Sequence, residues 1–215
     1  MSLPDVHYYL SLNSPWTYLG HQRFMALAGD AGVHVNLHLV DFGVVFPRTG
    51  GLPLPERSPQ RQAYRLQELA RWRDHLGVAL NLHPAHWPAN DTLATGLVMA
   101  ARDAGLDAAT LAGAYMRAVW AEERDIGARD TALAIAAEQA IDAASLEDRV
   151  QSCLAERERD SQAAVQCGVF GAPSYVIGEQ IYWGQDRLDF VARHLNGEIF
   201  WGQDRLDFVE RKLAG

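Results

Sequence analysis

The residue best placed for chemistry is Ser14, which directly precedes Pro15 at the start of an expected helix. Serine is a preferred helix N-cap, and proline suits the first helical position because its φ is already set. A side chain at that place faces the free N–H groups and the positive end of the helix dipole. A serine hydroxyl does not ionise near neutral pH. We therefore expect Ser14 either to cap the helix only or to donate a hydrogen bond to a thiolate that a ligand brings.

A second candidate is Pro173, which follows Ala172 directly before an expected strand. A cis peptide bond is tolerated at such a place, in a tight turn. It would leave the backbone N–H and C=O of Ala172 unpaired and available to an extended peptide. The alternative is an ordinary trans proline at the start of a strand, which would have no such role.

A third candidate is the segment Trp183, Gly184, Gln185 and Asp186, which ends an expected strand and begins a helix. Gln185 or Asp186 can cap that helix. Asp186 could also bind the ammonium group of a ligand. Both interpretations remain open at this stage.

The elements that position these residues begin with a strand–helix–strand unit. Residues 6–12 and 33–40 have the composition of strands, and the helix between them is expected to end at Gly32. Such a βαβ unit is expected to be parallel and right-handed. Residues 46–57 are rich in proline and glycine and are predicted to form a loop.

Helical signals dominate for roughly the next hundred residues. Ser58-Pro59 repeats the cap-and-proline pattern, and Gly77 is expected to end that helix. Pro84 and Pro88 keep the segment 80–90 non-helical. The remaining expected helix starts are Asn90 or Asp91, Asp107, Asp130, and a capping box formed by Ser145 and Asp148 before a helix that reaches Gln166.

The chain then returns to strands. Residues 174–177 and 181–183 are predicted to form a β-hairpin, and a helix is predicted from Gln185. The order βαβ, helices, ββα is the thioredoxin arrangement interrupted by an all-helical block. We therefore predict an α/β thioredoxin-like domain of residues 1–57 and 166–195, a helical insertion of residues 58–165, and a tail of residues 196–215.

The tail contains a repeat, because residues 183–191 (WGQDRLDFV) recur unchanged as residues 201–209. Two copies do not make a solenoid. The first copy directly follows its hairpin partner, so we assign it to the sheet and regard the second as an appended strand and helix. The alternative places the second copy in the sheet and loops out residues 178–196. The tail could cap a sheet edge, act as a domain-swapped arm, or have no role.

The composition of the chain excludes several classes of function. With 215 residues and a net charge of −8, the chain is long enough for a full core and too acidic for a surface that tracks nucleic-acid phosphates. It has no apolar run long enough to span a membrane and no visible secretory signal, so we expect a cytoplasmic protein. Cys153 and Cys167 are the only cysteines, and no metal motif is present. We expect both cysteines to be small core residues, away from the start of the first helix.

Together these segments resemble the 2-hydroxychromene-2-carboxylate isomerases, which are relatives of the kappa-class glutathione transferases and of DsbA. The resemblance covers residues 6–195 and rests most on YYLSLNSPWTYLG and GVFGAPSYVIGEQIYWGQDRL. It implies a thioredoxin-like fold with a helical insertion, of the DsbA and kappa glutathione transferase type. It also implies a glutathione-dependent enzyme, usually a homodimer, that isomerises a small aromatic carboxylate from aromatic-compound catabolism.

The resemblance also assigns roles to residues. Ser14 matches the catalytic serine beside the glutathione sulfur, and Ala172, before Pro173, matches the residue whose backbone pairs with the glutathione cysteine. Trp183, Gly184, Gln185 and Asp186 match the loop that holds the γ-glutamyl end. On the substrate side, His86 and Trp87 match lining residues of the family. Phe46 stands where relatives have a lysine, and Arg48 could supply the missing charge.

The mechanism that this resemblance implies is covalent: the glutathione thiolate adds to a conjugated carbon, the adduct rotates about the former double bond, and the thiol leaves. The product would be trans-o-hydroxybenzylidenepyruvate. Two alternatives remain open. One is a kappa-like glutathione transferase or peroxidase that acts on small electrophiles. The other is a non-catalytic thioredoxin-fold scaffold.

Overall fold

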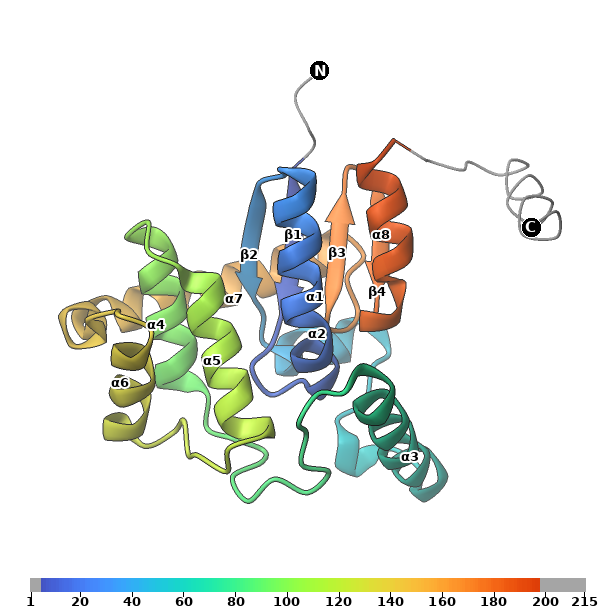
Figure 1. Ribbon diagram of the computed structural model, residues 1–215, viewed down its shortest axis with the longest axis horizontal. Helices are drawn as coiled ribbons and strands as arrows, with labels where there is room; N and C mark the ends of the chain where they lie inside the picture. Colours follow the sequence, from blue (N-terminus) through green and yellow to red (C-terminus); the bar gives the residue numbers. More distant parts are fainter. Residues whose placement is uncertain (1–4, 198–215) are drawn as a thin grey trace, which may run out of the picture.

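A four-stranded mixed sheet forms the centre of the molecule (Figure 1). The computed structural model describes residues 5–197, and the second copy of the repeat lies outside these residues. The strand order is β2-β1-β3-β4, with β2 parallel to β1 and the other neighbours antiparallel. The strands are β1 (Val6–Leu10), β2 (Val35–Leu39), β3 (Ser174–Ile177) and β4 (Gln180–Trp183).

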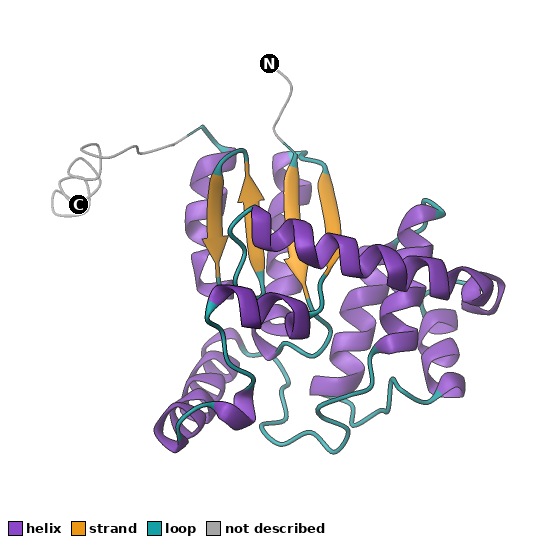
Figure 2. Ribbon diagram, turned by 180° about the vertical axis from the view of Figure 1, so that it is seen from behind, coloured by secondary structure: helices purple, strands orange, loops and turns teal. Residues whose placement is uncertain are grey.

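Helices cover both faces of this sheet. Figure 1 shows α1 and α8 in front of the strands, and Figure 2 shows α7 and α2 across the opposite face. The starts of α1 and β3 and the end of β4 therefore meet at one end of the sheet, the lower end in Figure 1. The bounds of these helices are α1 (Pro15–Ala31), α2 (Phe42–Thr49), α7 (Val150–Gln166) and α8 (Leu188–Leu195).

The remaining helices lie between α2 and α7 in the chain. Three of them pack beside the β2 edge, whereas α3 lies apart, below the start of α1 (Figure 1). These helices are α3 (Pro59–Leu76), α4 (Thr92–Asp103), α5 (Ala108–Trp120) and α6 (Arg129–Glu138). Short 3₁₀ helices span Leu54–Glu56, Ala143–Arg149 and Gln185–Arg187.

Helix boundaries largely follow the local signals in the sequence. Ser14 caps α1 and Ser58 caps α3, each by accepting the backbone N–H three residues on. Gly32 and Gly77 end these helices in the left-handed conformation, at φ +66° and +62°. The first copy of the repeat supplies Trp183, the last residue of β4, and the first half of α8, up to Val191.

Two predicted local structures are wrong. Part of the predicted loop 46–57 belongs to α2, because Asp41 caps that helix and Val45 is buried beneath it, while Pro47 is tolerated within its eight residues. The capping box of Ser145 and Asp148 does not form. The Ser145 hydroxyl donates to the Asp142 carbonyl instead, within a 3₁₀ turn that precedes α7.

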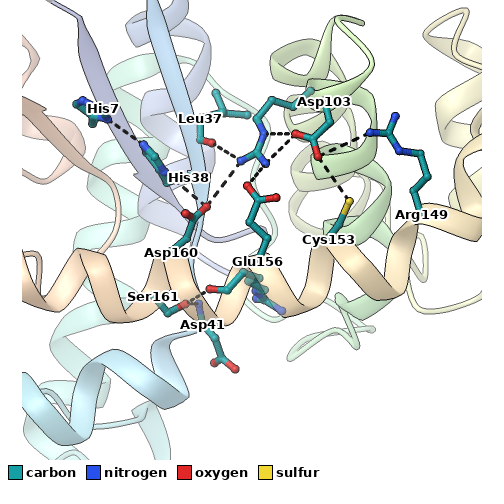
Figure 3. Close-up of polar contacts among 12 residues, drawn as sticks. His7, Leu37, His38, Asp41, Asp103, Arg149, Cys153, Glu156, Asp160 and Ser161 are labelled. Atoms are coloured by element: carbon teal, nitrogen blue, oxygen red, sulfur yellow. Dashed lines mark hydrogen bonds and ion pairs between the residues drawn. The ribbon is translucent and has the colours of Figure 1, made fainter.

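Arg102 of α4 connects the helical block to the sheet. Figure 3 shows its partners Leu37, Glu156 and Asp160. Its Nη1 donates to the Leu37 carbonyl of β2 at 3.1 Å, and its Nη2 pairs with Glu156 of α7. Asp160 of α7 lies 3.7 Å from Arg102 and 3.5 Å from His38. This partly buried network links α4, β2 and α7, so the helices cannot shift along the sheet without breaking several charged contacts.

His21 is the one histidine of the described residues that lies in the core. Its side chain is buried between α1 and α5, where Nε2 lies 2.9 Å from the Ala109 carbonyl and Nδ1 lies 3.2 Å from the Tyr8 hydroxyl. Because a carbonyl can only accept, Nε2 carries the proton and Nδ1 accepts from Tyr8. Burial lowers the pKa of His21 to about 4, against a smaller raising effect of the Ala109 carbonyl.

A consequence for acid stability follows. Because His21 binds fewer protons in the folded chain than in the unfolded one, its contribution to stability is full above pH ~6.5 and declines toward pH ~4. The total loss is about 3 kcal/mol. We expect the difference in unfolding free energy between the wild type and His21→Gln, measured by urea unfolding, to shrink over this interval. Parallel stability curves for the two proteins would contradict the assignment.

Candidate functional site

Ser14 lies at the start of α1 and contacts a segment far away in the chain. Its hydroxyl oxygen accepts the Thr17 amide at 3.2 Å, and its O–H donates to the Ala172 carbonyl at 3.3 Å. The first turn of α1 contains no acidic residue, so no side chain there offsets the positive end of the helix. This corner can therefore stabilise an anion.

The bond between Ala172 and Pro173 is cis, as predicted. The prediction that both backbone groups of Ala172 are unpaired is wrong for the carbonyl, which accepts a hydrogen bond from the Ser14 hydroxyl. Within residues 5–197, the Ala172 amide has no hydrogen-bond acceptor. One backbone donor beside Ser14 is thus open to a ligand.

The loop after β4 is tied to the proline turn. The Gly184 amide donates to the Pro173 carbonyl at 2.9 Å. Gly184 has φ +107°, a conformation that L side chains rarely adopt, so glycine is required here. Trp183 is half exposed, and its indole ring lies against Gly171. A Cβ added to Gly171 would come within 2.3 Å of the Trp183 Nε1. The two loops therefore form one continuous surface.

Gln185 is held by a residue that the sequence did not reveal. Its side chain is buried, and its Oε1 accepts a hydrogen bond from Arg23 of α1 at 2.8 Å. Gln185 and Asp186 lie within a 3₁₀ turn, and neither side chain caps this turn or α8, so the predicted capping role is wrong. Asp186 is partly exposed beside Arg187, 3.2 Å away, and is accessible to a cation.

The three expected substrate residues are less closely gathered. Arg48 lies on α2, is exposed, and donates to the Val44 carbonyl of its own helix. His86 is exposed and lines a shallow hollow of about 290 Å³, which residues 85–90 and Asp125 form. Trp87 lies in the same hollow. Within residues 5–197, Arg48 forms no hydrogen bond or ion pair with Ser14 or Trp87.

Trp87 is attached to the segment that carries Ser14. Its Nε1 donates to the Asn13 carbonyl at 3.0 Å. The Asn13 side chain in turn accepts the Ala89 amide at 2.8 Å and donates to the Ala89 carbonyl at 3.0 Å. The segment 87–89 is therefore clamped next to Ser14. Asn13 was not singled out from the sequence, because its partners are more than seventy residues away.

Sequence reasoning also missed Arg65 of α3. Its guanidinium lies over the Trp87 ring, 5.1 Å from the ring centroid. Nothing in the local sequence of α3 distinguishes this arginine from the others on the helix.

The two cysteines lie away from the site. Cys153 is buried in α7, as expected. Cys167 is exposed, so its predicted place in the core is wrong. Cys167 directly follows Gln166, the last residue of α7. Its side chain is exposed, whereas Val169, two residues further on, is buried. Serine stands at the start of α1, Cys153 lies on α7 and Cys167 directly follows α7, so the chain has no thiol of its own at this corner.

The sheet order, the cis proline beside the start of α1, and the helical block define a thioredoxin-like fold with a helical insertion. The family model described as DSBA-like thioredoxin domain matches residues 5–196, and the chain belongs to this family. Among curated proteins, the 2-hydroxychromene-2-carboxylate isomerase of Pseudomonas putida is 27% identical over 186 residues, which is 85% of this chain and 90% of that protein.

Two solved structures support the same fold. A structure of a 2-hydroxychromene-2-carboxylate isomerase matches with TM-score 0.75 and 23% identity, over 98% of this chain and 100% of that one. The cytosolic disulfide reductase DsbM from Pseudomonas aeruginosa, solved with GSH, matches with TM-score 0.63 and 18% identity, over 98% and 100%. The resemblance predicted from sequence is thus confirmed.

No helix within residues 5–197 has the length and apolar character needed to cross a membrane.

The close contact between Gly20 of α1 and Gln185 can be tested by substitution. A Cβ on Gly20 would lie 2.8 Å from the Gln185 Cβ, whereas a Cβ on Gly29 of the same helix would meet nothing within 4 Å. We expect Gly20→Ala to lower the free energy of unfolding by about 1–3 kcal/mol through overpacking. Gly29→Ala should raise it by roughly 0.5–1 kcal/mol through helix propensity. Denaturant unfolding measures both, and equal effects of the two substitutions would argue against the contact.

Proposed function

We propose that this chain is a glutathione-dependent isomerase that converts 2-hydroxychromene-2-carboxylate, or a related intermediate of aromatic catabolism, to trans-o-hydroxybenzylidenepyruvate. The observation that carries the proposal is the contact between the Ser14 hydroxyl and Ala172, before a cis proline, at the start of a helix without a cysteine. The names of the relatives support the same activity.

The residues at this corner suit glutathione. The free Ala172 amide and the adjoining carbonyl match the backbone of a short extended peptide. Asp186, partly exposed beyond Gly184, matches the ammonium group of a γ-glutamyl end. A structural neighbour solved with GSH supports this choice of ligand. Ser14, Ala172, Pro173, Trp183, Gly184, Gln185 and Asp186 would hold it.

Glutathione would supply a thiolate nucleophile, which gives a conjugated double bond temporary single-bond character and so permits rotation. The chain's own contribution centres on Ser14. Its hydroxyl has a single proton, which it donates to the Ala172 carbonyl. A ligand amide that takes over this carbonyl would free the Ser14 proton for a sulfur anion. The oxygen would remain anchored by the Thr17 amide.

The substrate side is assigned to Trp87, His86 and Arg48. Trp87 provides an aromatic surface fixed next to Ser14 through the Asn13 carbonyl. His86 is exposed in the adjoining hollow and can exchange a hydrogen bond with substrate. Arg48, which carries a positive charge on α2, is the residue that the sequence offers for the carboxylate. We further propose, as the resemblance implies, that the protein acts in the cytoplasm as a homodimer.

The chain offers a matched pair of serines to test this role. Ser14 and Ser58 both precede proline and both cap a helix. Replacing either by alanine should lower stability by about 1 kcal/mol. Only Ser14→Ala should also reduce kcat for glutathione-dependent isomerisation, by about 10²–10³, the usual effect of losing one stabilising donor. The measurement is steady-state turnover of 2-hydroxychromene-2-carboxylate with saturating glutathione.

The same assay separates the alternatives. Full turnover by Ser14→Ala would remove Ser14 from the mechanism. Turnover of chlorodinitrobenzene without isomerisation would favour a kappa-like transferase. An absence of binding heat when glutathione is titrated into the wild-type protein would favour a non-catalytic scaffold.

A further inference from the structure

The guanidinium of Arg65 lies on a cluster of aromatic rings. Its Cζ is 5.1 Å from the centroid of Trp87 and 6.0 Å from that of Trp120. The two indole rings are themselves in contact, with centroids 5.6 Å apart. Trp120 is fully buried in α5, so this cluster joins α3, the segment 80–90 and the helical block.

The Arg65 guanidinium has no hydrogen-bond acceptor in the part of the chain that the structure describes. Within residues 5–197, it forms no ion pair or hydrogen bond with another side chain or carbonyl. By contrast, Arg71 and Arg73 of the same helix pair with Glu68 and Asp74. Burial and the nearby charge of Arg57 lower the pKa of Arg65 to about 10, so it stays charged at neutral pH. An unpaired charge in such surroundings is costly.

The position of the Arg65 side chain nevertheless favours the binding of an anion. A guanidinium is planar, and a carboxylate binds at the edge of its fork through two parallel hydrogen bonds. The contact of Arg65 with the two indole rings also restricts its rotamers before a ligand arrives. Less entropy is then lost on binding.

The indole ring of Trp87 lies between Arg65 and the segment that carries Ser14. The Trp87 ring that Arg65 covers donates through Nε1 to the carbonyl of Asn13, the residue directly before Ser14. An anion held by Arg65 would thus belong to a molecule that can extend along Trp87 toward Ser14.

We propose that Arg65 binds the carboxylate of the aromatic substrate through the edge of its guanidinium. This assignment rests on the proposed function and deepens it, because it replaces Arg48 as the residue that recognises the acid group. Arg48 is exposed and already donates to a carbonyl of its own helix. Arg65 is half buried and, within residues 5–197, has no hydrogen-bond or ion-pair partner. Arg65 therefore distinguishes the carboxylate from uncharged analogues.

The test is a binding experiment that needs no turnover. Chromone-2-carboxylate serves as a non-reacting flat acid and chromone-2-carboxamide as its uncharged match. In calorimetric titrations of the wild-type protein with glutathione present, the acid should bind about 10- to 100-fold more tightly than the amide, the range for hydrogen bonds to charged groups. Arg65→Gln should abolish this preference, and Arg65→Lys, which lacks the planar fork, should keep part of it.

Arg71→Gln is the matched control, because it removes the same charge from the same helix and should leave the preference unchanged. Arg65→Gln should melt no lower than the wild type, since it removes an unpaired charge. In turnover assays, Arg65→Gln should raise KM for the carboxylate substrate at least tenfold while kcat changes less.

The outcomes separate the two proposals. An undiminished preference for the acid in Arg65→Gln would overturn the assignment of Arg65, whether or not the enzyme isomerises its substrate. A preference that depends on Arg65, in a protein without isomerase turnover, would support the anion site and overturn the proposed reaction instead.

Discussion

The hydrogen bond from the Ser14 hydroxyl to the Ala172 carbonyl joins two segments that are 158 residues apart in the chain. One segment ends β1 and starts α1, and the other starts β3, so this contact exists only when β1 and β3 pair in the register observed. The Gly184 amide extends the connection to the loop after β4. The whole candidate site is therefore a property of the assembled sheet and not of any single loop.

Features with local causes were the ones that could be predicted from the sequence. Ser14 and Gly32 delimit α1 through caps that involve neighbouring residues, and the cis bond at Pro173 depends on proline chemistry. The α/β order followed from periodicity and turn residues alone. The placement of Ser14 opposite Ala172 came from the family resemblance, because no local pattern reports a contact across the sheet.

The errors arose where tertiary packing outweighed a local signal. The residues around Pro47 resemble a loop in composition, yet α2 forms because Val45 is buried and Asp41 caps its start. Gln185 is polar and adjoins a helix start, which suggested a cap, but Arg23 from α1 takes its side chain. Arg23 and Arg65 could not be identified in advance, since their partners lie 162 residues away and on a separate segment, respectively.

The helical block contributes to the candidate site as well as to the core. Asn13 clamps the segment 87–89 and Trp120 supports the Trp87 ring, so the block carries an aromatic surface to the start of α1. The chain as a whole has a net charge of −8, and long-range attraction does not favour anions. Recognition of an acidic ligand then depends on short-range contacts with positive groups that have no internal partner. A half-buried guanidinium held over an aromatic ring beside the site meets that requirement, and an exposed arginine that is screened by solvent meets it less well.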